Sequence, residues 1–165
     1  MPYQLSSPVY RAAVLELVRT ARGRFVFAGT IGAQLHLAEA LGADKEGPPA
    51  RAIDVIPLDG ALLPTSIGSV DVRVVNSRGF DASIAASACR ITLEDATVPV
   101  ASPEHILGTT LAGDRLTTEG RWASFALLRA MEHRGVDLEE VRGFIKRCDE
   151  PDREQLLHEL AYLAA

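Results

Sequence analysis

Cysteine is scarce in this sequence, which has only two, Cys89 and Cys148. They stand far apart and form neither a CxxC pair nor any other metal-ligand spacing. The four histidines are scattered as well, at His36, His105, His133 and His158. Because no two of them form an HxxxH pair, the sequence predicts no zinc site. We interpret both cysteines as free thiols, kept reduced in the cytoplasm.

Long apolar runs are also missing, since no segment approaches the ~20 residues that cross a bilayer. The start of the chain, MPYQLSSPVYRAAVLELV, lacks the basic segment and apolar block of a signal peptide. Positive charge is not in excess either, because 17 basic residues stand against 22 acidic ones and the formal net charge is -5. This balance argues against a dedicated nucleic-acid surface. We therefore expect a cytoplasmic protein without a membrane segment.

The chain does contain enough apolar material for one core. With 165 residues, 47% of them hydrophobic, we expect a single domain over residues 1–165. Helical periodicity predicts helices at residues 6–23, 29–43, 102–113, 117–135, 137–148 and 152–165. Alternating or short buried apolar runs predict strands at residues 24–28, 51–58, 70–77, 90–93 and 97–100.

The order of these elements predicts the fold class. Residues 59–69 read as a connection, and residues 78–89 as a short helix or turn. A helix, a strand, a helix, several strands and then helices indicate an α+β domain with a small mixed sheet flanked by helices. Residues 1–100 would carry the sheet, and residues 101–165 would form a helical C-terminal half.

Gly29 and Thr30 follow a predicted buried strand and open a predicted helix. The start of a helix leaves backbone N–H groups free and carries the positive end of the helix dipole, which suits a phosphate. The alternative is that Gly29 only makes the tight turn between the strand and the helix. Both interpretations stay open at this stage.

Asp54 and Asp71 each lie in a predicted strand. If these strands are neighbours, the two carboxylates can meet at one end of the sheet and hold Mg²⁺ against a phosphate. Such an ion would position an attacking hydroxyl for phosphoryl transfer. The alternative is that Asp71 faces solvent and Asp54 caps a turn.

Four stretches together resemble a known family. They are FVFAGTIGAQLH, ARAIDVIPL, VDVRVV and TVPVASPEHILGTTLAGDR. Their order is similar to that of the nucleotidyltransferase superfamily, and most of all to small bacterial proteins of the minimal and AbiEii-like type, some of which are toxin–antitoxin components. The resemblance covers roughly residues 24–130. It implies a nucleotide-binding sheet with a glycine-helix motif at Gly29, metal-binding carboxylates at Asp54 and Asp71, and Mg²⁺ as the cofactor.

The departures from the family pattern fall on the catalytic motifs. Asp54 takes the second position of the two-aspartate strand, and the first falls on Ala52, which cannot bind a metal. Two-metal transfer needs a shared carboxylate and further ligands, so at best one weakly held Mg²⁺ would remain. Asp44 or Asp59 would have to replace the missing acid from a loop.

The late helix departs from the family pattern as well. Thr109 or Thr110 stands where the family often has a lysine. Arg115 and Arg121 are then the remaining candidates for phosphate contacts in this part of the chain.

Three functions remain open for this sequence. The first is a catalytically impaired nucleotidyltransferase-fold protein that binds a nucleotide, a phosphate or a protein partner, for example in a toxin–antitoxin pair. The second is an active Mg²⁺-dependent nucleotidyltransferase that moves a nucleotidyl group from an NTP to a hydroxyl. The third is a non-enzymatic interaction protein or homodimer. Convergence of Asp54 and Asp71 beside Gly29 favours a metal site, whereas pairing of either acid with Arg51 or Arg73 favours a closed one.

Overall fold

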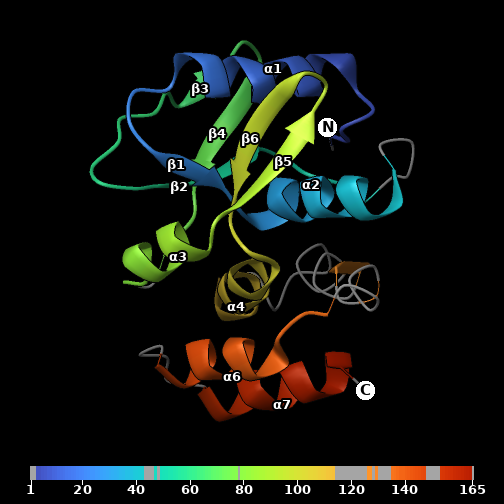
Figure 1. The fold of residues 1–165 in the computed structure, drawn as a ribbon, viewed down its shortest axis with the longest axis vertical. Helices are drawn as coiled ribbons and strands as arrows, with labels where there is room; N and C mark the ends of the chain where they lie inside the picture. Colours follow the sequence, from blue (N-terminus) through green and yellow to red (C-terminus); the bar gives the residue numbers. More distant parts are fainter. Residues whose placement is uncertain are drawn as a thin grey trace.

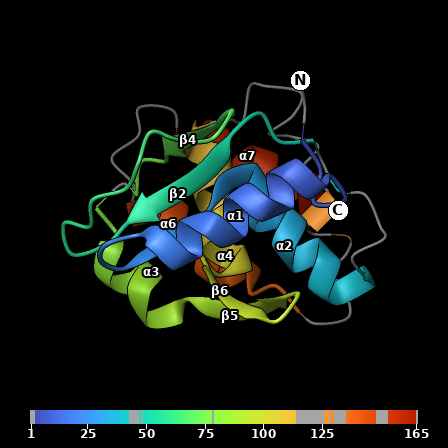
Figure 2. The same ribbon diagram turned by 90° about the horizontal axis from the view of Figure 1, so that it is seen from above.

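The computed structural model describes residues 3–42, 47, 49–77, 79–113, 126, 127, 129, 135–147 and 153–164. The fold is α+β, as the order of elements predicted, with a six-stranded mixed sheet between layers of helices (Figure 1). Helix α1 (Pro8–Thr20) lies on one face of the sheet, and α2 (Gly29–Leu41) and α4 (Pro103–Gly113) lie on the other (Figures 1 and 2). The other described helices are α3 (Asp81–Ser87), α6 (Leu138–Arg147) and α7 (Arg153–Ala164).

The sheet runs in the order β3-β4-β2-β1-β6-β5. Its strands are β1 (Phe25–Phe27), β2 (Ile53–Pro57), β3 (Ser66–Ile67), β4 (Val70–Val74), β5 (Cys89–Leu93) and β6 (Ala96–Val100). β1 is antiparallel to β2 and parallel to β6, whereas β2 is parallel to β4. Because Phe27 at the end of β1 pairs with Val55 of β2, the turn after β1 lies beside the start of β2.

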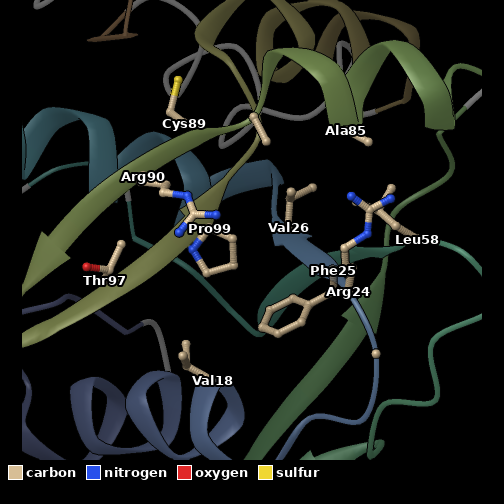
Figure 3. A pocket seen from close by; sticks show the side chains of 12 residues that line it. Val18, Arg24, Phe25, Val26, Leu58, Ala85, Cys89, Arg90, Thr97 and Pro99 are labelled. Atoms are coloured by element: carbon tan, nitrogen blue, oxygen red, sulfur yellow. The ribbon is translucent and has the colours of Figure 1, made fainter.

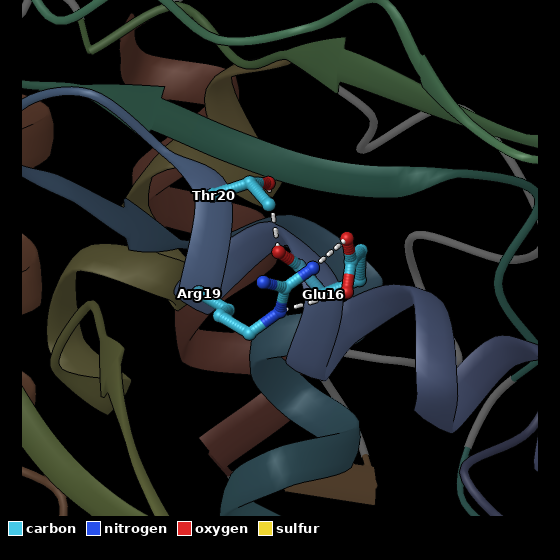
Figure 4. Close-up of polar contacts among 3 residues, drawn as sticks. All are labelled: Glu16, Arg19 and Thr20. Carbon is cyan, nitrogen blue, oxygen red and sulfur yellow. Dashed lines mark hydrogen bonds and ion pairs between the residues drawn. The ribbon is translucent and has the colours of Figure 1, made fainter.

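Several elements differ from the sequence prediction; the predicted strand at residues 70–77, for example, ends at Val74. The connection at residues 59–69 contains the short edge strand β3, which pairs with β4. The first helix ends at Thr20 rather than at Gly23, because the backbone is already extended at Ala21, with ψ 137°. In its last turn the Thr20 hydroxyl donates to the Glu16 carbonyl at 2.8 Å, and Arg19 pairs with the Glu16 carboxylate (Figure 4).

Two predicted helix starts are confirmed in detail. The Ser102 hydroxyl accepts a hydrogen bond from the His105 N–H at 3.2 Å, and Pro103 follows as the first helical residue. The Asp137 carboxylate accepts from the N–H groups of Glu139 and Glu140 at 3.1 Å each. Both side chains satisfy donors that the first turn of a helix leaves unpaired.

The C-terminal helices form a separate layer against α4 (Figure 1). Phe144 of α6 packs so closely on α4 that a Cβ atom at Gly108 would lie 2.5 Å from its ring. The predicted helix at residues 117–135 falls mostly outside the described residues. No helix in the described part of the chain is long and apolar enough to cross a membrane.

Candidate functional site

The turn between β1 and α2 holds the predicted phosphate seat. The chain leaves the sheet at Phe27 and enters the helix at Gly29, which has a left-handed φ of +52°. The N–H of Ala28 donates to the main-chain carbonyl of Asp54 at 2.9 Å, which ties the turn to β2. Ala28 is also the N-cap residue of α2, and its methyl side chain cannot cap the helix.

The carboxylate of Asp54 takes over the capping role. The side chain is 1% exposed, and its Oδ2 accepts a hydrogen bond from the backbone N–H of Thr30 at 3.2 Å. A Cβ atom at Gly29 would lie 2.4 Å from the same oxygen. The sequence therefore needs glycine here because the carboxylate occupies the space beside the backbone. The positive end of the helix thus has an internal anion, which the helix dipole stabilises.

Arg73 holds the other oxygen of this carboxylate. β2 and β4 are parallel, and Asp54 lies level with Arg73 in their register. The Nε–H of Arg73 donates to Asp54 Oδ1 at 2.6 Å. The Arg73 side chain is 52% exposed, so the pair joins a buried anion to a cation that reaches solvent. The two charges therefore neutralise each other beside the predicted phosphate seat.

Asp71 does not share this environment. It lies two residues before Arg73 in β4, is exposed, and pairs in register with Ser66 of the edge strand. Within the described ranges, no group of three or more histidine, cysteine, aspartate or glutamate residues is placed to hold a metal ion. The position that the family pattern gives to the first acid, Ala52, is buried, and its carbonyl accepts a hydrogen bond from the Tyr10 hydroxyl at 3.3 Å.

Two other predicted site residues that the structure describes have different partners. Asp59, a candidate for the missing acid, forms an ion pair with Arg24. Thr109 is buried in α4, where its hydroxyl donates to the His105 carbonyl at 2.8 Å. Arg115 and Arg121, the predicted phosphate contacts, lie outside the described residues, as does Asp44.

A polar cluster around His105 was not predicted from the sequence. Its Nδ1 lies 2.7 Å from the Ser102 hydroxyl and 3.1 Å from that of Ser87, and its Nε2 lies 3.1 Å from that of Ser83. Burial lowers the pKa of His105. Ser83 and Ser87 stand four apart on α3, a spacing that places both on one helix face, and this was the available signal. The imidazole links α3 to α4 through hydroxyl groups.

The chain was also compared with known proteins. No protein-family model matches it, and no curated protein matches it either.

Proposed function

We propose that this chain is a nucleotidyltransferase-fold protein that has lost catalysis and acts by binding a protein partner. The observation that carries the proposal is the commitment of the Asp54 carboxylate, whose two oxygens accept hydrogen bonds from Arg73 and from the Thr30 N–H. A partner in a toxin–antitoxin pair fits the resemblance of the sequence to the small bacterial members of that superfamily.

The topology supports the fold part of the proposal. A strand leads through a glycine turn into a helix, and the neighbouring antiparallel strand brings an aspartate to that turn. This is the placement that the resemblance implied for Gly29 and Asp54. The third strand of the motif, β4, lies on the far side of β2, as the expected neighbour.

The electrostatics support the loss of catalysis. A magnesium ion at Asp54 would have to replace the Arg73 guanidinium, and it would gain no second carboxylate from Ala52. A phosphate at the start of α2 would meet the Asp54 carboxylate, which is of the same charge, in the space beside Gly29. Both requirements of phosphoryl transfer, the metal and the seated phosphate, are therefore opposed by groups of the chain itself.

One observation favours the alternative, an active Mg²⁺-dependent nucleotidyltransferase. Because half of the Arg73 side chain is exposed, the guanidinium can turn into solvent if a magnesium ion replaces it as the cation beside the buried Asp54 carboxylate. Asp54 would then be available to one magnesium ion, and Asp71 stands on the neighbouring strand.

Isothermal titration with ATP, GTP, CTP and UTP, each with and without Mg²⁺, tests the proposal. We expect no binding of any nucleotide at submillimolar concentration. Mg²⁺-dependent binding that is lost in Asp54→Asn would establish the alternative instead. Binding without Mg²⁺ would show that the start of α2 still accepts a phosphate. The Arg73→Ala variant tests whether the guanidinium keeps a metal ion away from Asp54. If it does, this variant should bind nucleotide with Mg²⁺ more tightly than the native chain.

A further inference from the structure

The strand β5 ends the sheet on one side, and no other strand of the described residues pairs with its outer edge. The opposite edge of the sheet is β3, which has only two residues. Very short edge strands protect a sheet from pairing with another chain, and so do prolines and bulges. β5 has five residues, CRITL, with no proline, and its register with β6 is continuous. It is therefore the edge at which this sheet is able to grow.

The register of the β5–β6 hairpin shows which backbone groups of β5 face outward. A two-residue turn at positions 94 and 95 joins the strands, and Leu93 pairs with Ala96 across it. Residues that flank such a turn form a hydrogen-bonded pair, and bonded and non-bonded pairs then alternate along the ladder. The N–H and C=O groups of Arg90 and Thr92 therefore point away from β6. In the described part of the chain, nothing forms a hydrogen bond with these four groups.

The side chains along this edge carry opposite charges four residues apart. Arg90 and Thr92 alternate with buried residues of β5, so both lie on the same face of the hairpin, and both are exposed. Figure 3 shows Arg90 on this face, beside its register partner Pro99. Glu94, in the turn, is exposed as well. Thr92 thus stands midway between a cation and an anion.

Neither charge is fully engaged inside the chain. Arg90 borders a hollow that three carboxylates also line, those of Glu39, Glu104 and Glu140. Even so, the structure shows no ion pair between Arg90 and any described carboxylate. Glu94 uses Oε1 for an ion pair with Arg11 at 3.1 Å, and its side chain is 56% exposed. Both groups are therefore accessible to another molecule.

Antiparallel pairing of two copies of β5 brings these charges together. With a two-fold axis at Thr92, Arg90 of each copy lies opposite Glu94 of the other, on the same face of the joined sheet. The outward backbone groups of the two copies also meet each other, as a hydrogen-bonded ladder requires. An axis at Arg90 would instead oppose two like charges, and an axis at Ile91 would place Arg90 opposite Thr92. The charges therefore favour the axis at Thr92.

We infer that β5 pairs with β5 of a second copy of this chain, which joins the two sheets across a two-fold axis at Thr92. The interface is isologous, because each copy gives the other the same strand and the same two charges. Addition of a strand to an exposed sheet edge is a recurrent mode of protein recognition. One strand edge buries less than the roughly 800 Å² per partner of a standard interface, so we expect dimers only above about 100 µM. This self-association goes beyond the proposed function and does not rest on the loss of catalysis.

Sedimentation equilibrium of two charge-reversal variants, alone and mixed, tests the inference. Arg90→Glu places acid opposite acid at both ion-pair positions, and Glu94→Arg places base opposite base. Each variant alone should dimerise at least about tenfold more weakly than the native chain. An equimolar mixture should form a heterodimer about as tight as the native dimer, because acid then faces base at both positions. A change in folding or in net charge alone would not produce this recovery.

Two controls accompany the mixture. Arg11→Gln removes the ion pair that Glu94→Arg also removes inside the chain, and it should leave dimerisation of the native strand unchanged. Circular dichroism of each variant identifies any that fail to fold.

Cross-linking locates the axis. Thr92→Cys places two thiols across it with their Cα atoms about 5.5 Å apart, within the range of a disulfide, so mild oxidation should give a covalent dimer. Thr97→Cys is the matched control, because Thr97 is the exposed register partner of Thr92 on β6, one strand further from the edge. Its two copies would lie about 14 Å apart, which is too far for a disulfide. The native chain shows how much its own two cysteines contribute.

A chain that stays monomeric up to about 1 mM would overturn the inference. So would a dimer that Arg90→Glu leaves intact, a mixture that does not recover, or a Thr92→Cys chain that cross-links no more than Thr97→Cys. These results leave the loss of catalysis untouched. Conversely, Mg²⁺-dependent nucleotide binding defeats the proposed function and does not affect the dimer.

Discussion

Asp54 and Arg73 form an ion pair across the parallel β2–β4 ladder, with the guanidinium Nε 2.6 Å from the carboxylate Oδ1. The aspartate is 1% exposed and the arginine 52% exposed. The pair stands where the resemblance to nucleotidyltransferases would place a metal ligand. It also connects the centre of the sheet to the start of α2 through Thr30. The same contact therefore has a structural consequence and a functional one, and each can be measured.

Replacing Asp54 should destabilise the fold, whereas replacing Asp71 should not. Asp54→Asn keeps the shape but removes the charge from a buried acceptor of two hydrogen bonds, which should cost about 2 kcal/mol or more. Asp71→Asn is the matched control, because it changes an exposed side chain, and its effect should stay within about 0.5 kcal/mol. Urea denaturation of the three chains measures the difference. Equal effects would contradict the placement of the two carboxylates.

Gly29 should tolerate alanine less well than Gly60 does. Both glycines have positive φ, +52° and +71°, so both substitutions carry a backbone cost of about 1–2 kcal/mol. Only at Gly29 would the new methyl group overlap the Asp54 carboxylate, since nothing lies within 4 Å of the same position at Gly60. We expect Gly29→Ala to lower the free energy of unfolding by at least about 1 kcal/mol more than Gly60→Ala. A smaller effect at Gly29 would mean that the carboxylate is not seated there.

The His105 cluster should make stability depend on pH. Burial, together with Arg147, lowers the pKa of His105, while Glu104 acts in the opposite direction. As the pH falls, the unfolded chain therefore binds a proton at this histidine before the folded chain does. The contribution of His105 to the free energy of unfolding is complete above the unfolded pKa of about 6.5 and is lost as the pH falls below it. The native chain should lose up to about 1.4 kcal/mol per pH unit from this residue, and His105→Gln should lose correspondingly less.

Urea denaturation of native and His105→Gln chains from pH 8 down to pH 5 measures this effect. Between pH 8 and pH 7 the two curves of unfolding free energy against pH should run parallel, which serves as the control. Parallel curves over the whole range would show that the imidazole is not held in its neutral form by the fold.

Gly108 and Gly143, in the two packed helices α4 and α6, should respond in opposite directions to alanine. Gly108 of α4 has no room for a methyl group, because the Phe144 ring lies 2.5 Å from the position of its Cβ atom. Gly108→Ala should therefore cost about 1–3 kcal/mol. Gly143 of α6 has only the Arg147 guanidinium near this position, at 3.9 Å, so alanine should stabilise α6 by up to about 1 kcal/mol. Thermal unfolding of both variants checks the docking of α6 on α4.

The sequence was sufficient to predict most of the fold. The glycine turn after β1, the β5–β6 hairpin and the caps Ser102 and Asp137 are local signals, in which a few neighbouring residues determine the conformation. The short strand β3 was missed because its two residues pair only through the register of β4, which no local pattern specifies. Length and periodicity likewise could not show where the first helix ends.

The candidate site was predictable only in part. The sequence placed Asp54 beside Gly29 through the family resemblance, and it named Arg73 as one of the residues that would close the site. It could not decide between a metal and the arginine, because that choice depends on the parallel register of β2 and β4.

The most direct test of the central claim uses the Thr30 amide, which donates to the Asp54 carboxylate and so reports on any ion bound there. Amide NMR spectra of the labelled chain are recorded while Mn²⁺ and ATP are added together, with Asp54→Asn as the control. We predict that the Thr30 signal broadens no more than amides elsewhere on the surface. Selective broadening of Thr30 that disappears in Asp54→Asn would contradict the account, because it would place a metal ion at the carboxylate that Arg73 is proposed to occupy.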